Sequence, residues 1–553
     1  MIIGPTLFRI PVEEIFFFCI QTYIGTCLHI LLNKPVLLPT YLQRDADLPA
    51  ESRLNYHKRL GQIFFAFAFV VPLLNLNGDK EATYMRLISV WASPVLYLLW
   101  SLAYQLLAGL PNSKTILAIN LTTAYLWIVD MFALRRGTWS IASGTKLGIN
   151  LWPINLELEE AIFFLATNTL IVFGSCAFDN SIAILDAFPD LFPTVPTIPS
   201  PVLMIKCLLL PTFEYDGERL KGLRNALAIL SKKSRSFYLA SGVFSGRLRI
   251  DLVLLYAYCR VADDLIDNAG TRKEAEQWLR RLSHFLDIAY SSKRTEESWE
   301  AALSPFPDAE KSVLALLPTD RLPVKPLRSL LDGFRSDLDF ARAEDTASTR
   351  TRNSKPPPPP IQTEKDLENY ATRVASTVAE LCLHLVYFHD PSSKPVSGAK
   401  KSRCLSAGRN MGVVLQYINV VRDVHTDAET GRCYIPADWF DDPKANSSPE
   451  AFKAELLRHR QRILNAAFEL YEENRVAIED LPEYARGGIR VAVESYVEIG
   501  RVMREKMARG EPLDMAGGGK AGRASVPTLR RLWAGWAAMA AWRFRSSRTS
   551  VRP

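Results

Sequence analysis

The feature that most limits how this chain can fold is a series of five apolar runs near its N-terminal end. They cover residues 12–32, 61–76, 87–110, 115–134 and 160–178. Each approaches the roughly 20 residues that a helix needs to cross the hydrocarbon of a bilayer. A water-soluble domain can bury one such helix, but five leave too little polar surface to cover them. The sequence therefore predicts a multi-pass helical membrane module.

The composition of the remaining chain predicts a second, more polar domain, because most of the charge lies after residue 205. The formal net charge of +7 is small for 553 residues and gives no reason to expect nucleic-acid binding. The eight cysteines form no CxxC pair, which argues against a zinc site and a disulfide framework. No GxGxxG follows a predicted strand and no GxxxxGK[ST] occurs, so we expect no nucleotide cofactor.

A Pro-rich stretch without helical periodicity, AFPDLFPTVPTIPSP at 187–201, separates the two parts. We therefore expect a membrane module at 1–186, a linker at 187–205, a second domain at 206–540 and a tail at 541–553.

Three further segments have predicted roles. PVLMIKCLLLP at 201–211 is too short to span a bilayer and is predicted to lie at the membrane interface or to dock on the domain, with a sixth spanning helix as the alternative. A polyproline stretch at about 345–362 is predicted to be a disordered loop. The basic aromatic segment PTLRRLWAGWAAMAAWRFR at 527–545 is predicted to be a helix that packs on the domain or lies on the bilayer surface.

Two widely separated segments of the second domain carry matching polar stripes. The first, LLYAYCRVADDLIDN at 254–268, places Tyr256, Arg260, Asp263 and Asp267 at offsets 0, 4, 7 and 11. The second, VVLQYINVVRDVHTD at 413–427, places Gln416, Asn419, Asp423 and Asp427 at offsets 0, 3, 7 and 11. On a helix, each stripe lies along one face and brings two aspartates within one turn of each other.

Aspartates that face each other across a cavity need a positive partner, because carboxylates taken out of water are costly. Mg²⁺ suits them, since it prefers hard oxygen ligands and is usually held by one or two carboxylates plus substrate phosphate oxygens. Arg260 and Arg422 would add donors that are shaped for phosphate. One such stripe alone is more often a solvated helix face. Two matching stripes flanked by apolar residues favour a magnesium and diphosphate site, with Mn²⁺ as an alternative ion.

These segments resemble the two aspartate-rich motifs of the phytoene and squalene synthase family. YATRVASTVAEL lies between them, RCYIP follows the second, and the resemblance runs from about Leu220 to about Trp536. SKKSRSFYLAS at 231–241 resembles the segment of the family that first contacts diphosphate. The resemblance implies an all-α isoprenoid synthase domain with a central cavity, which joins two prenyl diphosphates through a cyclopropyl intermediate. One departure, Ala379 where the family usually has Gly, predicts altered close packing.

The same resemblance implies roles for individual residues. Four aspartates would bind Mg²⁺: Asp263, Asp267, Asp423 and Asp427. Seven residues would contact the diphosphates or steer carbocations: Tyr256, Arg260, Tyr370, Gln416, Asn419, Arg422 and Tyr434. Four residues of the opening segment would bind substrate: Ser234, Arg235, Ser236 and Phe237.

The membrane module contains an internal repeat. IPVEEIFFFCIQT at 10–22 aligns with NLELEEAIFFLATN at 155–168, so that Glu13 corresponds to Glu159 and Glu14 to Glu160. The repeat predicts two copies of one helical unit. Acidic residues also stabilise helix N-termini by roughly 0.3 to 1 kcal/mol. That preference does not explain the same Glu-Glu-x-x-Phe pattern twice.

Ionisable residues at membrane depth indicate a functional site by default. A carboxylic acid in an apolar site can protonate an alkene, and a second carboxylate can take a proton from the resulting carbocation. The candidate residues are Glu13, Glu14, Asp130, Glu159 and Glu160. The rings of Trp127, Trp139, Trp152 and Phe163 are candidates to stabilise the cation. Any single ring of this kind more often belongs to an interfacial belt.

With the synthase attached, the module resembles the fungal type of lycopene cyclase that is fused to phytoene synthase. The resemblance implies cyclisation of lycopene ends to β rings without a redox change, giving γ- or β-carotene. It also implies geranylgeranyl diphosphate as the synthase substrate. The second copy has an upstream block, AYLWIVDMFALRRGTWSI at 124–141, whose counterpart would lie before Met1. We therefore expect an N-terminally shortened cyclase module, which puts cyclase but not synthase activity in question.

Two alternatives stay open. A squalene-type synthase with a membrane anchor would need a reductive step, for which no nicotinamide site is visible in the sequence. A module that only anchors the synthase would form no rings. The expected partners are prenyl diphosphates, carotenoids and the lipid bilayer, with other carotenoid enzymes as an open point and no nucleic acid. We expect a multi-pass membrane protein with a cytosolic synthase domain, in a membrane that the sequence does not identify.

Overall fold

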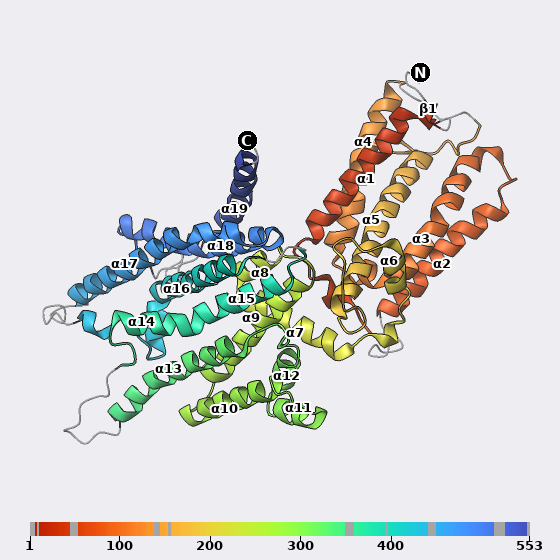
Figure 1. The fold of residues 1–553 in the computed structure, drawn as a ribbon. Helices are drawn as coiled ribbons and strands as arrows, with labels where there is room; N and C mark the ends of the chain where they lie inside the picture. Colours follow the sequence, from red (N-terminus) through yellow and green to blue (C-terminus); the bar gives the residue numbers. More distant parts are fainter. Residues whose placement is uncertain are drawn as a thin grey trace. The chain divides into compact units, whose positions relative to one another are not determined.

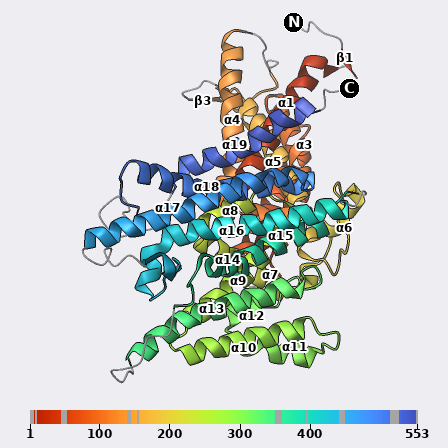
Figure 2. The same ribbon diagram turned by 60° about the vertical axis from the view of Figure 1, so that its left-hand side comes forward.

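The computed structural model describes residues 6–7, 10–44, 53–137, 144–152, 156–348, 359–392, 396–440, 449–513 and 526–549. The chain divides into two compact units, Met1–Lys221 and Gly222–Pro553, which we call the membrane unit and the synthase unit. Both are built from helices (Figures 1 and 2), which confirms the expected all-α class. Strands in the described residues form only two short antiparallel pairs. These are β1 (Thr6–Leu7) with β2 (Ile10–Pro11) and β3 (Asn150–Leu151) with β4 (Leu156–Glu157).

Five long helices make up most of the membrane unit. They are α1 (Val12–Asn33), α2 (Arg53–Leu74), α3 (Thr83–Gly109), α4 (Asn112–Arg135) and α5 (Leu158–Ala187). All five are long and apolar enough to cross a membrane, as the sequence predicted. The second begins earlier than its apolar run, and Pro72 lies inside its last turns. The 3₁₀ turns η1 (Leu38–Tyr41) and η3 (Lys80–Ala82) lie in the connections before α2 and α3.

Polar side chains join α1, α4 and α5, which lie side by side (Figure 1). Gln21 of α1 donates hydrogen bonds to Thr167 Oγ1 at 2.9 Å and to Asn168 Oδ1 at 3.1 Å on α5. Asn168 in turn donates to Thr123 Oγ1 of α4 at 3.1 Å. Lipid tails are as apolar as leucine, so membrane helices associate through close packing and such interhelical hydrogen bonds. This network therefore holds the three helices in one register.

A glycine allows α2 and α3 to pack closely. A Cβ on Gly61 would lie 2.3 Å from the ring of Trp100, so any larger residue would displace that indole. The Trp100 Nε1 donates to the carbonyl of Lys58 at 3.0 Å across the same contact. The indole ring of Trp100 on α3 thus occupies the space beside Gly61 of α2, where a side chain would otherwise lie.

Between α5 and residue 217, the described residues contain no further helix of spanning length. The short helix α6 (Pro201–Leu208) begins at Ser200, whose side chain accepts a hydrogen bond from the Leu203 amide at 3.3 Å. Cys207 of α6 is buried in a cluster with Leu185 of α5. The turn η4 (Thr212–Glu214) follows. The segment predicted at 201–211 thus packs against the last turns of α5.

The synthase unit contains helices of very different length. They are α7 (Gly217–Lys233), α8 (Arg235–Ser241), α9 (Gly246–Asp267), α10 (Arg272–Ala289), α11 (Glu296–Leu303), α12 (Asp308–Leu314), α13 (Val324–Ser348), α14 (Glu364–Ala371), α15 (Thr377–Phe388), α16 (Gly398–Glu429), α17 (Pro449–Asn474), α18 (Glu483–Ala508) and α19 (Thr528–Thr549). The first residues of α7 belong to the membrane unit. Two 3₁₀ turns, η6 (Ala437–Phe440) and η8 (Arg475–Asp480), lie among them.

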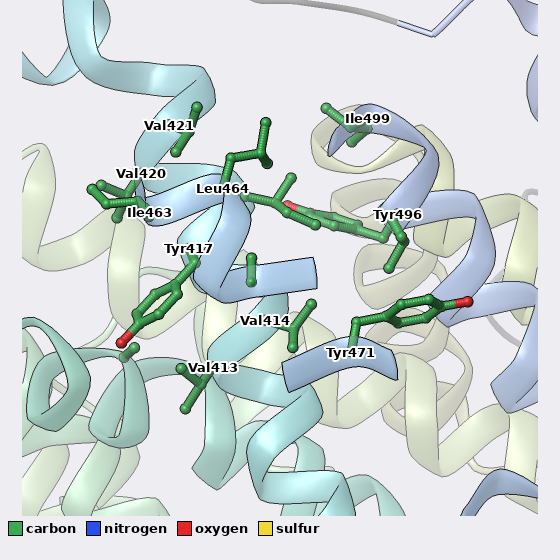
Figure 3. Packing of buried hydrophobic residues seen from close by; sticks show 14 of the residues in the cluster. Val413, Val414, Tyr417, Val420, Val421, Ile463, Leu464, Tyr471, Tyr496 and Ile499 are labelled. Atoms are coloured by element: carbon green, nitrogen blue, oxygen red, sulfur yellow. The ribbon is translucent and has the colours of Figure 1, made fainter. Parts of the chain in front are cut away.

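The helix α16 forms the centre of this unit, because it packs against α15, α17 and α18. Figure 3 shows its side chains Val413, Val414, Tyr417, Val420 and Val421 against Ile463 and Leu464 of α17 and Tyr496 and Ile499 of α18. Burying one such aliphatic side chain is worth roughly 1.5–3 kcal/mol. The polar stripe of α16 is therefore held in place by an apolar opposite face.

The segment YATRVASTVAEL is interrupted by a π-helical turn, η5 (Thr372–Ser376), between α14 and α15. Such turns within α-helices are frequent at functional sites. Gly412 of α16 lies against this turn, and a Cβ there would be 2.6 Å from the Cα of Ser376. The close approach of two backbones thus requires glycine at this position.

Candidate functional site

A cavity of about 430 Å³ lies inside the synthase unit and is lined mainly by apolar side chains. Helices α8, α9, α13, α15, α16 and α18 all contribute to its wall. Among the described residues, its charged lining side chains are Arg260, Asp263 and Asp337. Its amide side chains are Gln416, Asn419 and Asn474, and its tyrosines are Tyr256, Tyr370 and Tyr496. The helices that carry the two aspartate motifs therefore border one apolar cavity.

The first aspartate motif lies at the C-terminal end of α9. Tyr256, Arg260 and Asp263 line the cavity, and Arg260 pairs with Asp263 at 2.8 Å and with Asp264 at 2.5 Å. Asp267, one turn further, pairs with Arg432 at 2.8 Å. Burial and repulsion by Asp267 raise the pKa of Asp263 to about 7, although Arg260 opposes this shift. Negative charge at this pair is therefore incompletely balanced.

The second motif lies on α16, and its stripe extends from the cavity wall to residues outside the lining. Gln416 and Asn419 line the cavity, and Asn419 donates to Gln416 Oε1 at 3.3 Å while it accepts a hydrogen bond from Tyr496. Arg422 holds Asp423 in a two-pronged ion pair at 2.7 and 2.9 Å. That carboxylate is buried. Asp427, at the end of the stripe, is half-buried.

A buried aspartate that the sequence did not single out joins two of the predicted tyrosines. Asp337 of α13 accepts hydrogen bonds from Tyr370 at 3.2 Å and from Tyr434 at 2.8 Å. The two rings stack with their centroids 4.8 Å apart. Burial raises the pKa of Asp337 to about 7, against the opposing effect of Arg432. Its segment FRSDLDF resembles an ordinary charged helix face, so no sequence pattern distinguished it.

Arg432 is a second residue that the sequence did not single out. It belongs to RCYIP, directly after the α16 stripe, and its guanidinium pairs with Asp267 of the first motif. It also lies close enough to Asp337 for their charges to interact. One arginine thus connects the first aspartate motif with the segment that follows the second.

The opening segment contributes one cavity residue and one helix cap. Ser234 caps α8 by accepting a hydrogen bond from the Phe237 amide at 3.3 Å. Phe237 lines the cavity and stacks on Tyr496 with centroids 5.5 Å apart. Ser236 is buried, whereas Arg235 is exposed. Of the four predicted substrate-binding residues, the structure therefore brings Phe237 into the cavity wall.

The donors that could hold a metal ion are carboxylates paired with arginines. In the part of the chain that is described, no group of three or more His, Cys, Asp or Glu side chains converges on one point. The chemistry of the donor set nevertheless fits Mg²⁺, because Asp263 and Asp267 supply hard oxygens one turn apart and repel each other. A divalent cation between them would relieve that repulsion, and substrate phosphate oxygens would complete its coordination.

A second group of acids lies at the N-terminal end of α5 in the membrane unit. Glu159 is fully buried, and its Oε1 accepts a hydrogen bond from the Leu147 amide at 2.5 Å. Its Oε2 is buried without a hydrogen-bond partner among the described residues. Glu160 accepts a hydrogen bond from the Tyr84 hydroxyl at 3.1 Å. Asp130 of α4 is buried and near enough to Glu160 for their charges to interact.

The corresponding residues of the first copy have a different environment. Glu13 and Glu14 lie in the first turn of α1 and are exposed. The repeat is nevertheless visible in the packing, because the α1 residues Phe17 and Phe18 meet α5 phenylalanines edge to face at centroid distances of 6.3 and 6.2 Å. The structure thus gathers Asp130, Glu159 and Glu160 but leaves the first glutamate pair outside.

The aromatic candidates among the described residues have different environments. Trp127 donates its indole N–H to the carbonyl of Ala161 at 3.1 Å. Phe163 stacks on Trp91 with centroids 6.1 Å apart. Trp152 is 92 % exposed, and Trp139 lies outside the described residues.

Two polar contacts of the membrane unit were not anticipated. Tyr84, the partner of Glu160, lies on α3 and far from the acids in sequence. At the opposite end of α1 and α5, the buried His29 pairs with Asp179 at 2.9 Å. Neither contact has a local spacing that sequence reasoning could detect.

Comparisons with known proteins show the family to which the chain belongs. Residues 230–529 match the squalene/phytoene synthase family. The bifunctional lycopene cyclase/phytoene synthase of Phaeosphaeria nodorum is 46% identical over 97% of this chain and 88% of its own length. That of Neurospora crassa is 43% identical over 96% of this chain and 88% of its own length. A dehydrosqualene synthase crystal structure covers 58% of this chain and 97% of its own, with a TM-score of 0.43 and 21% identity.

Proposed function

Because this chain belongs to the family of fungal bifunctional lycopene cyclase/phytoene synthases, we propose that each of its units carries out one of the two reactions. The synthase unit joins two geranylgeranyl diphosphates into phytoene through prephytoene diphosphate. The membrane unit closes the ends of lycopene into β rings. The observation that carries the synthase assignment is the apolar cavity bordered by both aspartate motif helices.

In the synthase unit, the four motif aspartates would hold Mg²⁺, with Mn²⁺ as the alternative. When bound, the metal withdraws charge from the diphosphate leaving groups. Arg260 and Arg422 are suited to bind phosphate oxygens, since each already forms close ion pairs with carboxylates. Substrate phosphates would compete with those carboxylates for the guanidinium groups as the metal takes the carboxylates.

The remaining cavity residues would control the carbocations that form when diphosphate leaves. Tyr370 lines the cavity and stacks on Tyr434, and Asp337 accepts hydrogen bonds from both hydroxyl groups. An aromatic face attracts a cation with about 0.5–2 kcal/mol, more where water is absent. The apolar lining excludes water, which would otherwise trap the cation as an alcohol.

In the membrane unit, Glu160 is suited to act as the general acid, because its oxygen accepts from the Tyr84 hydroxyl and so faces a group that can position a proton. The proton adds to the terminal double bond of lycopene, and a C–C bond forms from the neighbouring alkene to close the ring. Glu159 or Asp130 would then accept the proton that the ring carbon releases. The proton count is unchanged, so the reaction is an isomerisation.

The assignment is tested by assaying the full-length protein with C15 and C20 diphosphates, each with and without NADPH. We expect phytoene from the C20 substrate alone, independent of NADPH. A preference for the C15 substrate together with NADPH-dependent squalene would instead support the squalene-type alternative. Expression in lycopene-producing cells tests the membrane unit, where β-ring products support a cyclase and their absence supports a non-catalytic anchor.

Location follows from the same assignment. Five spanning helices would put the synthase unit on the same side of the membrane as the connection between α1 and α2, and we propose that this side is the cytosol, where prenyl diphosphates dissolve. Phytoene and lycopene are insoluble in water, so a shared membrane anchor keeps both reactions beside the bilayer.

A further inference from the structure

The last helix of the synthase unit, α19, has two contrasting faces, and polar contacts fix the inner one. Arg530 donates to Glu498 at 2.6 Å and to both oxygens of Glu505 at 2.6 and 2.7 Å on α18. Arg490 of α18 donates to the Ala538 carbonyl at 3.1 Å. Figure 2 shows the two helices side by side. α19 is therefore a docked part of the synthase unit.

The outer face of α19 is apolar and has no partner among the described residues of this unit that would cover it. It consists of Leu529, Leu532, Trp533, Trp536 and Met539, whose exposed fractions run from 47% to 82%. The positions recur every three or four residues, so the side chains form one continuous stripe. The two tryptophan rings lie 4.9 Å apart. Such a stripe facing water would be unfavourable, which indicates that something apolar covers it.

The inner face of α19 packs on α8, and basic side chains lie near this contact. Ala538 of α19 packs with Ala240 of α8, the short helix that contributes Phe237 to the cavity. Arg531 lies near enough to Arg235 for their charges to interact, and Arg235 and Lys232 are both exposed. Positive side chains of α19 and α8 therefore lie close to each other where the two helices pack.

We propose that the outer face of α19 is a membrane-interface surface that seats the synthase unit on an anionic bilayer. Tryptophan is enriched at the headgroup level of membranes, and a helix with one apolar aromatic face and flanking arginines lies in that plane. Basic residues near an anionic membrane surface add electrostatic attraction. The bilayer is also the partner already at hand, because the same chain carries five helices of spanning length.

Contact of the synthase unit with the bilayer would help phytoene to leave the cavity. Phytoene leaves an apolar cavity and cannot enter water at useful concentration. A bilayer against the outer face of α19 would be separated by this one helix from α8, whose Phe237 forms part of the cavity wall. The product would then have only a short distance to travel from the cavity to lipid.

Photo-crosslinking of the full-length protein tests what covers the outer face. Benzoylphenylalanine replaces Trp536 in one variant and Val476 in the control, since Val476 is also exposed, at 62%, but lies outside α19 in η8. Both are reconstituted in vesicles of phosphatidylcholine and phosphatidylserine and illuminated. We expect at least fivefold more lipid adduct at position 536 than at 476 by mass spectrometry. Adducts with a second copy, adducts with residues 1–221, or equal lipid yields would overturn the proposal.

An activity measurement tests whether the docking matters. In the variant Trp533→Ala/Trp536→Ala, we expect phytoene formation in vesicles to fall at least threefold while formation in detergent stays within twofold of the unchanged protein. Val476→Ala should change neither. The detergent assay reports on folding, so an equal loss in detergent and vesicles would assign these tryptophans a structural role, and no loss in vesicles would remove the docking function.

Discussion

The carboxylates of the two units have different neighbours, and the difference separates two kinds of chemistry. In the synthase unit, Asp263, Asp267 and Asp423 each pair with an arginine. In the membrane unit, Glu159 and Glu160 accept hydrogen bonds from a backbone amide and a tyrosine hydroxyl. A carboxylate beside arginine is held as an anion, which suits metal and diphosphate binding. A carboxylic acid beside neutral donors can carry a proton to substrate.

Asp263 shows that the contrast is one of degree. Its pKa is raised to about 7 by burial and by Asp267, despite the paired Arg260. The synthase acids thus need more positive charge than their arginines supply, and the proposed divalent cation would provide it. The proton transfer proposed for the membrane unit would make no such demand, since Tyr84 and the Leu147 amide already donate hydrogen bonds to its glutamates.

The largest expected effect is the loss of ring formation when an acid of the membrane unit is replaced. Glu160→Gln should lower β-ring formation by about 10²- to 10⁴-fold, because it removes the proton donor, and should leave phytoene formation unchanged. Carotenoid products of lycopene-producing cells, separated by chromatography, measure it. Glu14→Gln is the matched control, since the same position of the first copy is exposed and should have little effect. Equal losses from both changes would contradict the assignment to the second copy.

A corresponding change in the synthase unit should have the opposite selectivity. Asp263→Asn should lower phytoene formation by about 10²- to 10³-fold and spare ring closure, because it weakens binding of the charge that stabilises the departing diphosphate. Formation of radiolabelled phytoene from labelled C20 diphosphate measures the first, and Asp287→Asn, at a half-exposed partner of Arg328, is the control. Near-normal turnover of the Asp263→Asn variant would remove Asp263 from the metal site.

A smaller effect probes the tyrosines over Asp337. Tyr434→Phe removes one hydrogen bond to a buried carboxylate, worth about 1.5–3 kcal/mol, so we expect roughly a 10- to 100-fold loss of phytoene formation. Replacing Asp339 by Asn is the control for this region, because Asp339 is half-exposed beside the same helix turn. If Tyr434→Phe and Asp339→Asn lower phytoene formation by the same factor, Asp337 does not organise the cavity.

The smallest effect concerns stability alone. Gly412→Ala should lower the free energy of unfolding by about 1–3 kcal/mol, because the new methyl group meets the backbone of the π-helical turn. Gly487→Ala, where nothing lies within 4 Å, should leave stability unchanged or raise it by about 0.5–1 kcal/mol. Thermal unfolding of the full-length protein in detergent measures both. A Tm for Gly412→Ala at or above that for Gly487→Ala would contradict the close backbone approach.

Sequence reasoning predicted what depends on local pattern. Apolar length gave the five membrane helices, and helical spacing placed Tyr256, Arg260 and Asp263 on one side of α9, where all three reach the cavity wall. It missed Asp337 and Tyr84, because each becomes distinctive only through a partner on another helix. It also treated Glu13 and Glu159 alike, since the repeat is the same in both, whereas burial separates them.

In this account, carboxylates bind metal in the synthase unit and transfer protons in the membrane unit. The most direct test is to remove divalent metal ions from the full-length protein with a chelator. EDTA is added to the reconstituted protein, and phytoene formation from C20 diphosphate and ring formation from lycopene are measured in the same preparation. The account predicts that phytoene formation stops and returns with added Mg²⁺, while ring formation continues. Phytoene formation that persists in EDTA would contradict the account. Ring formation that stops in EDTA would contradict it as well.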